Sequence, residues 1–435
     1  MIDRRTLLAA SAAAGALAAT PAFAQSRSRT FPQGFLWGAA TSGHQVEGNN
    51  TNSDLWVLEH AEPTLFREAS GDACNSLMLW PTDLDLVQGL GLNCYRFSLE
   101  WARIEPAPGQ FSIAMLDLYK AMIDGCRQRG LAPLVTFSHY AAPRWFAERG
   151  GWLNPDAPAL FANFCSRAMR HLGEGIDHAI TLNEPNIMTV LKIVLPPQAM
   201  PALAAMVDSA ARTLNTPRLA VANATKVEEI PELLQALLQA HRQGKAAIKA
   251  VRGDVPVGMT LAVFDDEAVG DTAMRDAMRD ELYAMWTQAA REDDFVGVQN
   301  YERVRWGPEG RLPPPEGATL TQGGGEVYAP SLANACRYIH AQTQVPILVS
   351  EHGVSAVDDR IRADLITGAL RHLSDAMADG IPVKGYVHWS LLDNFEWVMG
   401  YEYQHGLFAV DRTSFARTAK PSAGVLGAIA RANAV

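Results

Sequence analysis

Short apolar, β-branched stretches recur eight times along the chain, and amphipathic segments of helical spacing lie between them. The strand-like stretches are FLWGAAT (35–41), CYRFSL (94–99), APLVTFSH (132–139), HAITLNE (178–184), VPVGMTLAV (255–263), FVGVQNY (295–301), PILVSE (346–351) and VKGYVHWSLL (383–392). The helical ranges are 83–91, 116–130, 158–173, 232–251, 332–343 and 361–380. Such alternation is typical of a parallel (β/α)8 barrel. An open doubly wound sheet would need a glycine-rich phosphate turn after a strand, and the sequence has no such motif. We therefore predict an α/β fold consisting of a single TIM barrel.

Polar side chains gather where these strands end. In a closed barrel the carboxyl ends of all strands meet at one mouth, which is where catalytic sites of this fold lie. The fifth strand offers no convincing candidate. The residues expected at the mouth are Gln45, Arg96, His139, Asn183, Glu184, Asn300, Tyr301, Glu351, Trp389, Glu396 and Trp397.

Two of these residues, Glu184 and Glu351, are carboxylates at strand tips. A pair of carboxyl groups flanking a glycosidic bond supplies the proton and the nucleophile or base that its hydrolysis needs. Sequence leaves the gap between them open, and therefore also the choice between retention and inversion. Arg96 and Tyr301 would favour the anion of Glu351, while Glu184 would keep its proton.

Two long segments, 187–231 and 303–330, follow strands on the predicted catalytic face. Such loops usually shape the pocket. A short helix is expected at 201–214, and the proline- and glycine-rich 303–330 segment shows no strong period.

The N-terminus has the form of an export signal. Arg4 and Arg5 precede a small-residue apolar run, and Ala22-Phe23-Ala24 fits a cleavage site. RRTLL resembles a twin-arginine signal. We predict a cleaved signal at 1–24, a catalytic domain at 25–435, a periplasmic or secreted location, and no stable membrane association after cleavage.

Composition narrows the possible partners. The formal net charge is −10, which does not favour a nucleic-acid partner. The five cysteines form no C-x-x-C pair, so we expect small buried hydrophobes and no metal or redox site. No predicted strand ends in a lysine, as a Schiff-base barrel enzyme would require.

Six segments, in order, resemble glycoside hydrolase family 1, the β-glucosidase family. They are FPQGFLWGAATSGHQVEG (31–48), YRFSLEWARIEP (95–106), GGWLNPD (150–156), TLNEPN (181–186), SEHG (350–353) and HWSLLDNFEW (388–397). The resemblance covers about residues 31–420.

The resemblance implies that Glu184 is the acid/base and Glu351 the nucleophile of a retaining mechanism, with Tyr301 and Arg96 holding the nucleophile. It also implies that the glycone is bound by Gln45, His139, Asn183, Trp389, Glu396 and Trp397. No cofactor or metal is implied. The chain departs from the family pattern at Tyr140, His352, Asn300 and 187–200, where a leaving group is expected to bind.

The resulting hypothesis is a retaining β-glycosidase that removes terminal non-reducing β-D-glucosyl residues, with β-galactosyl and β-fucosyl residues as further candidates. Its partner would be a small-molecule β-glycoside or oligosaccharide. Two alternatives stay open: a non-catalytic or weakly active sugar-binding barrel, and a 6-phospho-β-glycosidase. The sequence does not specify the oligomeric state.

Overall fold

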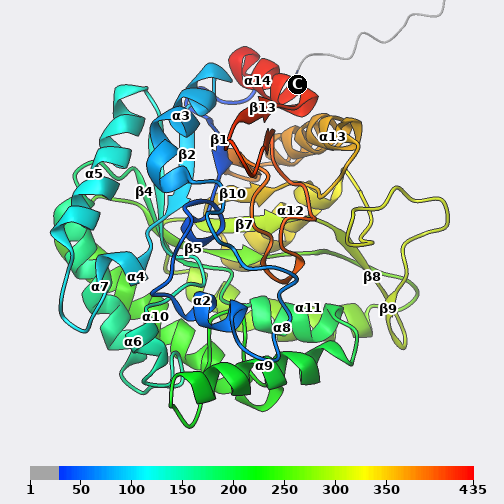
Figure 1. The fold of residues 1–435 in the computed structure, drawn as a ribbon. Coiled ribbons are helices and arrows are strands. Elements are labelled where there is room, and N and C mark those ends of the chain that lie inside the picture. The colour runs from blue at the N-terminus through cyan, green and yellow to red at the C-terminus, as the bar shows by residue number, and fades with distance from the viewer. Residues whose placement is uncertain (1–28) are drawn as a thin grey trace, which may run out of the picture.

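All eight predicted strands pair in parallel and close into one barrel (Figure 1). This computed structural model describes residues 29–435, and the strand order around the barrel is β1-β11-β10-β7-β5-β4-β3-β2. The barrel strands are β1 (Leu36–Ala40), β2 (Cys94–Ser98), β3 (Ala132–Ser138), β4 (His178–Asn183), β5 (Val257–Ala262), β7 (Val296–Asn300), β10 (Ile347–His352) and β11 (Val383–Trp389). The predicted TIM barrel is confirmed.

Helices surround the barrel (Figure 1). The outer helices are α3 (Ser76–Gly89), α5 (Ile113–Gln128), α7 (Ala157–Leu172), α10 (Ile230–Val251), α11 (Ala273–Ala290), α12 (Ser331–Thr343), α13 (Asp359–Ala378) and α14 (Pro421–Ala432). No helical range was predicted where α11 lies. Its buried residues begin only at Leu282, so its first half shows no apolar face.

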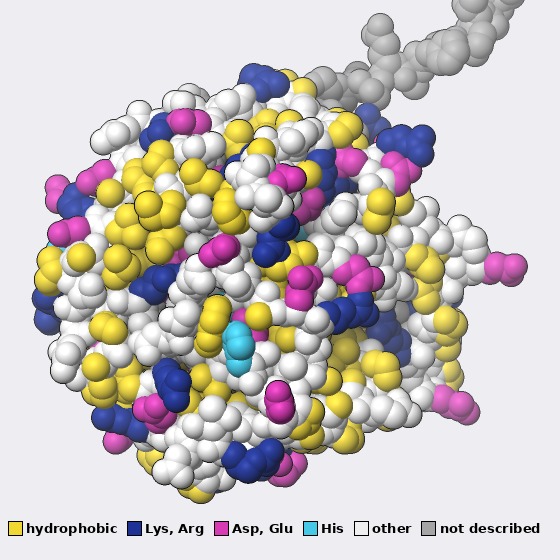
Figure 2. Space-filling view, in the orientation of Figure 1, with side chains coloured by type: hydrophobic (Ala, Val, Ile, Leu, Met, Phe, Trp, Pro, Cys, Tyr) yellow, Lys and Arg dark blue, Asp and Glu magenta, His cyan; other side chains and the backbone are white. Residues whose placement is uncertain are grey.

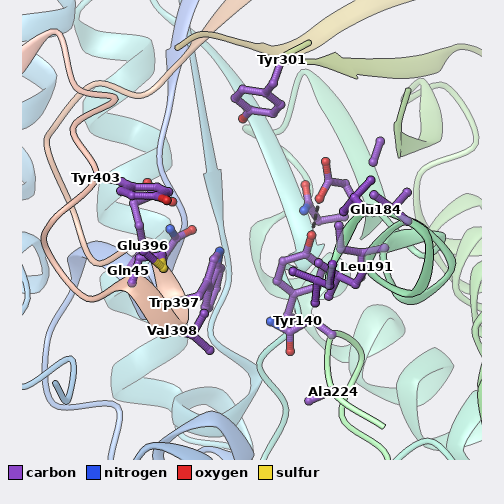
Figure 3. Close-up of a pocket in the computed structure, with 18 of the residues that line it drawn as sticks. Gln45, Tyr140, Glu184, Leu191, Ala224, Tyr301, Glu396, Trp397, Val398 and Tyr403 are labelled. Carbon is purple, nitrogen blue, oxygen red and sulfur yellow. Dashed lines mark hydrogen bonds between the residues drawn. The ribbon is translucent and has the colours of Figure 1, made fainter. Parts of the chain in front are cut away.

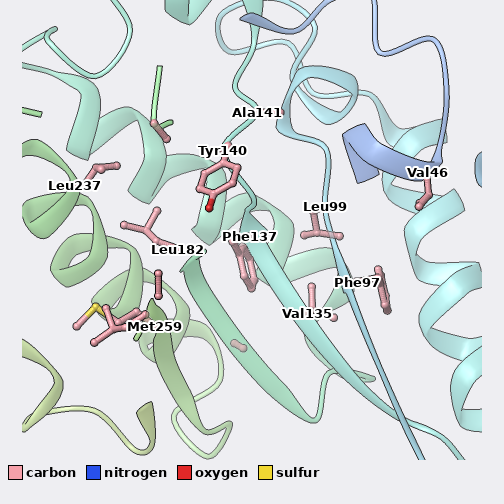
Figure 4. Close-up of a cluster of buried hydrophobic side chains, with 14 of the residues drawn as sticks. Val46, Phe97, Leu99, Val135, Phe137, Tyr140, Ala141, Leu182, Leu237 and Met259 are labelled. Carbon is pink, nitrogen blue, oxygen red and sulfur yellow. The ribbon is translucent and has the colours of Figure 1, made fainter. Parts of the chain in front are cut away.

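Alternation along each strand separates two apolar layers. On β3, Leu134 points into the barrel, whereas Val135 and Phe137 pack outward against the helices (Figure 4). The same alternation on β2 sends Tyr95 and Phe97 outward and leaves Arg96 inside the barrel. The core therefore holds a buried cation just below the mouth.

The two strands that carry the candidate carboxylates are irregular. The pairing of β4 with β5 shifts register between Ile180 and Asn183. The pairing of β10 with β7 shifts between Val349 and Glu351. A bulge of this kind changes the direction in which the following side chain points. Both strand tips can therefore present their glutamates to the mouth.

The two long segments on the catalytic face are partly regular. Residues 187–231 contain α8 (Ile187–Val194) and α9 (Ala199–Thr213), the second matching the predicted helix. Residues 303–330 contain a hairpin of β8 (Arg303–Gly307) and β9 (Gly310–Leu312), which the sequence did not indicate. The remaining elements are α1 (Gly43–Val46), α2 (Asp54–Glu59), α4 (Trp101–Ile104), α6 (Arg144–Ala147), η1 (Val227–Glu229), β6 (Asp265–Ala268), η2 (Trp397–Met399), β12 (Phe408–Val410) and β13 (Arg417–Ala419).

The predicted signal at 1–24 lies outside the described residues. Among residues 29–435, no helix combines the length and the apolar character needed to cross a bilayer. All five cysteines are buried, as predicted, and none of them forms a disulfide in the structure. On the face in Figure 2, acidic and basic side chains are interspersed, and no broad basic area is visible.

Candidate active site

A cavity of about 610 Å³ lies at the carboxyl ends of the barrel strands. Nine of the ten predicted site residues line it: Gln45, His139, Asn183, Glu184, Tyr301, Glu351, Trp389, Glu396 and Trp397. The tenth, Arg96, lies beneath the floor and is 1% exposed. Residues that lie more than 300 positions apart in the chain, such as Gln45 and Trp397, thus meet in one site, as expected from their positions near the strand ends.

Glu351 is held by two donors. The Arg96 guanidinium donates to Oε1, and the Tyr301 hydroxyl donates to Oε2 at 2.5 Å. Arg96 also donates to Asn183 Oδ1 at 2.5 Å and to the Ser350 carbonyl at 3.2 Å. Burial raises the pKa of Glu351, while the positive charge of Arg96 and the Tyr301 hydrogen bond lower that pKa. These two contacts are directed at the ionised carboxylate.

Glu184 has a different environment. The residue is 8% exposed, and its carboxyl group accepts a hydrogen bond from the Tyr140 hydroxyl. Burial, with a further contribution from the negative charge of Glu351, raises the pKa of Glu184 to about 8, against the opposing effect of the Tyr140 hydrogen bond. The surroundings of Glu184 therefore favour its protonated form, whereas the contacts of Arg96 and Tyr301 favour the ionised form of Glu351.

The aromatic side of the cavity is formed by stacked rings. His139 stacks on Trp389 with ring centroids 5.6 Å apart, and Trp397 lies 6.1 Å from His139 on a similar plane. Burial keeps the pKa of His139 well below its ordinary value, so the imidazole is neutral. Such flat apolar faces suit the C–H face of a pyranose ring.

Polar groups lie beside these rings, and Figure 3 shows Gln45 and Glu396 on the same side of the cavity as Trp397. Gln45 Nε2 donates to the Phe395 carbonyl at 2.8 Å, which joins the end of β1 to the loop that carries Glu396. Trp389 Nε1 donates to Glu396 Oε1 at 3.3 Å. Burial raises the pKa of Glu396 well above its ordinary range. Hydrogen bonds from the hydroxyls of a bound ligand would favour the ionised form of Glu396 and lower this pKa.

Three residues of the lining have left-handed backbones. Their φ angles are +70° for Tyr140, +41° for Glu184 and +51° for Trp397. Non-glycine residues adopt this region at an energetic cost and do so disproportionately at functional sites. The strained residues are therefore the acid/base candidate Glu184 itself and two other residues of the same cavity, Tyr140 and Trp397.

One predicted mouth residue is misplaced. Asn300 points away from the cavity, because its side chain donates to the Val263 carbonyl at 2.8 Å and accepts from Ser331 Oγ at 2.9 Å. Its neighbour Gln299 enters the cavity instead and donates to Asn183 Oδ1 at 2.8 Å. Successive side chains of a strand point to opposite faces, so Gln299 and the correctly predicted Tyr301 line the cavity while Asn300 between them turns outward.

The sequence also missed two supporting contacts. Thr260 on β5, the strand thought to contribute nothing, donates to Asn183 Oδ1 at 3.3 Å. Tyr140, noted only as a departure from the family pattern, contacts Glu184 directly. By contrast His352 lies away from the substrate side, with Nδ1 2.9 Å from the Tyr386 hydroxyl, and burial lowers its pKa to about 3.

Comparison of the sequence with known protein families identifies one match. The profile of glycosyl hydrolase family 1 matches residues 27–289 and 317–435. The chain belongs to this family. It is therefore a glycosyl hydrolase with β-glycosidase activity of the β-glucosidase type.

Three relatives of family 1 illustrate the match. A solved structure titled β-glycosidase BGL167 is 43% identical, covers 93% of this chain and 98% of its own, and superposes with a TM-score of 0.88. The β-glucosidase of Agrobacterium sp. is 29% identical over 92% of this chain and 95% of its own length. A bifunctional β-D-glucosidase/β-D-fucosidase of Bifidobacterium breve is 26% identical over 90% of this chain and 96% of its own length.

The stretch that the family 1 profile leaves unmatched, 290–316, contains β7 and the β8–β9 hairpin. Tyr301 lies in this stretch and nevertheless donates to Glu351. Sequence divergence here has therefore left the contact to the carboxylate in place.

Proposed function

We propose that this family 1 enzyme is a retaining β-glycosidase that hydrolyses terminal non-reducing β-D-glucosyl residues by double displacement. The observation that supports this most is the asymmetry of the two carboxyl groups. Arg96 and Tyr301 both donate to Glu351, whereas within residues 29–435 the Tyr140 phenol is the only side-chain donor to Glu184, whose pKa burial raises to about 8. A nucleophile must be ionised and a general acid protonated, and these environments favour that division.

In the first step a Glu351 carboxylate oxygen attacks the anomeric carbon while Glu184 transfers its proton to the departing glycosidic oxygen. The products are a free alcohol and a glycosyl ester of Glu351. The ester carries no charge, so the repulsion that helps raise the pKa of Glu184 is removed. Glu184 then takes a proton from water, and the resulting hydroxide displaces Glu351 with overall retention.

Gln45, His139, Asn183, Trp389, Glu396 and Trp397 are proposed to bind the glycone, since all six line the same cavity. The relative from Bifidobacterium breve is a bifunctional β-D-glucosidase/β-D-fucosidase, which supports β-fucosides as additional substrates. A 6-phosphate is disfavoured, because the Glu396 carboxyl group beside Trp397 would repel it and the Arg67 side chain in the same lining is already paired with Glu402.

The test is a panel of aryl β-glycosides (gluco, galacto, fuco, xylo and 6-phospho-gluco) with Glu351→Gly and Glu184→Gly in the presence of azide. Glu351→Gly should be rescued with formation of the α-glycosyl azide, and Glu184→Gly with formation of the β-glycosyl azide. If Glu351→Gly gave the β-azide, or if Glu351→Gln kept full activity, the assignment would be overturned. Absence of turnover by the wild type on every glycoside would favour the sugar-binding alternative.

We further propose that the chain is exported through its N-terminal RRTLL motif, with the mature protein starting near Gln25. Fractionation of cells expressing the full chain should find activity outside the cytoplasm. The Arg4→Lys/Arg5→Lys variant should leave it in the cytoplasm. Equal distribution of both proteins would contradict export by this signal.

A further inference from the structure

The helix that follows Glu184 turns an apolar stripe toward the cavity. Ile187, Val190, Leu191 and Val194 of α8 all line it, at positions i, i+3, i+4 and i+7. A stripe of this spacing normally packs against a core. Here Val190 is buried in the core, whereas Ile187, Leu191 and Val194 pack against the core only in part and also line the cavity. Figure 3 shows Leu191 close to Glu184 and Tyr140.

Further apolar residues line the same cavity, on the side of the α8 stripe and across from it. The cavity lining also includes Leu195, Ala199, Leu203 and Met206 from α9 and its approach, Val398 and Met399 from η2, and Leu55, Leu58, Leu65 and Phe66 from α2 and the segment after it. We call the α8 stripe together with these residues the apolar wall. Figure 3 shows the polar side chains of Gln45, Glu396 and Tyr403 across the cavity from Leu191 and Glu184.

Contacts on the far side of the two helices fix the wall in place. Lys192, on the opposite face of α8, pairs with Glu281 of α11 at 2.8 Å. Ser209 of α9 donates to the Glu62 carbonyl at 2.6 Å. The stripe is therefore presented to the cavity by anchored helices, and little ordering is needed when a ligand binds.

The chemistry of the wall selects its ligand. A second sugar carries hydroxyls on every side, and hydroxyls buried against aliphatic side chains lose hydrogen bonds to water without replacement. An apolar alcohol joined to the glycone needs only one polar contact, at the glycosidic oxygen beside Glu184. Its carbon skeleton would then cover the partly exposed side chains Ile187, Leu191 and Val194 and remove them from water.

We propose that the apolar wall is the leaving-group site and that it takes the aglycone of a β-glycoside whose alcohol is bulky and poor in hydroxyl groups. This rests on the proposed function, because it assumes that Glu184 protonates the leaving group. The size of the cavity, about 610 Å³, agrees with it, since that volume holds a drug-sized ligand rather than a single hexose.

The experiment uses n-alkyl β-glucosides from methyl to octyl, whose leaving groups have nearly constant acidity, so that differences report contact with the wall. The value of kcat/KM should rise with chain length, by up to about four-fold per methylene. Hexyl β-glucoside should exceed cellobiose by at least about ten-fold. A flat alkyl series, or cellobiose as the better substrate, would overturn the proposal.

Variants on one helix provide the matched control. Leu191→Gln and the nearly isosteric Val194→Thr should each lower the octyl-to-methyl ratio of kcat/KM, the first by about ten-fold. Lys192→Gln, between them in sequence but facing away, should leave that ratio unchanged. An equal ratio in all four proteins would refute the role of the wall, and thermal melting of each variant would identify a folding defect.

The outcome also separates this proposal from the proposed function. If all the β-glucosides are hydrolysed but show no dependence on chain length, the apolar wall has no role in binding and the enzyme assignment stands. If methyl and aryl β-glucosides are both left intact, the proposed function itself fails.

Discussion

Replacing Tyr140 by phenylalanine removes the only side-chain donor seen on Glu184 among the described residues. Both groups are buried, with Tyr140 4% and Glu184 8% exposed. A hydrogen bond to an ionised acceptor contributes about 1.5–3 kcal/mol, against about 0.5–1.5 kcal/mol for a neutral one. The hydroxyl thus favours the carboxylate of Glu184 by about 1.4 kcal/mol, which is about one pKa unit.

The sign follows from the role of Glu184. Its hydrogen bond from Tyr140 lowers a pKa that burial has raised to about 8. Loss of that bond raises the pKa further, so the protonated acid persists to higher pH. The basic limb of the kcat/KM profile should therefore move up by about one unit in Tyr140→Phe, because that profile reports the free enzyme.

The assay should follow glucose release from phenyl β-glucoside, whose leaving group requires protonation. A substrate with a highly acidic leaving group would conceal the limb, because it departs without help. If the basic limb of Tyr140→Phe stayed in place or moved to lower pH, either the Tyr140 contact or the assignment of Glu184 as the acid would be wrong.

Three further changes test other parts of the structure. Tyr301→Phe removes a hydrogen-bond donor that lowers the pKa of Glu351. The acid limb of the kcat/KM profile should therefore move to higher pH while the basic limb stays in place. A shift of the basic limb would contradict this. His352→Asn should leave both limbs in place, because burial lowers the pKa of His352 to about 3 and it is neutral throughout the assay, and a moved limb would show that it titrates with the site. Arg417→Met should lower the free energy of unfolding, measured in urea, by about 3–5 kcal/mol, because it removes one partner of a buried 2.8 Å ion pair and leaves the Asp83 charge uncompensated. The double variant with Asp83→Leu should recover most of that loss. If the losses of the two single variants simply added in the double variant, the pairing would be disproved.

The sequence was sufficient to predict the barrel and most of the mouth. Eight apolar stretches of strand length with helical segments between them admit few closed topologies, and the position of a side chain at a strand end determines where it lies in a barrel. Glu184 and Glu351 could be paired on this basis although 166 residues lie between them in the chain. The prediction needed no side-chain detail.

Side-chain direction was harder to predict. On β7 the sequence does not reveal whether Gln299 or Asn300 points inward, because a shift of one residue reverses every side chain on a short strand. The contact between Tyr140 and Glu184 joins two loops whose backbones have positive φ, a conformation that local propensity does not favour.

The apolar wall illustrates a different limit. The spacing of Ile187, Leu191 and Val194 indicates that one face of a helix is apolar, but it does not reveal what that face contacts. In this fold the face lines the cavity. Only the arrangement of α8 against the barrel mouth distinguishes a ligand-facing stripe from a core-facing one.

The central claim is that Glu351 forms a covalent bond to the sugar during turnover. The direct measurement is incubation with an activated 2-deoxy-2-fluoro-β-glucoside, followed by intact mass analysis and peptide mapping. We expect one fluoroglucosyl group per chain, attached to the peptide that contains Glu351, with none in Glu351→Gln. Attachment to the Glu184 peptide, or steady turnover of this substrate without any adduct, would contradict it.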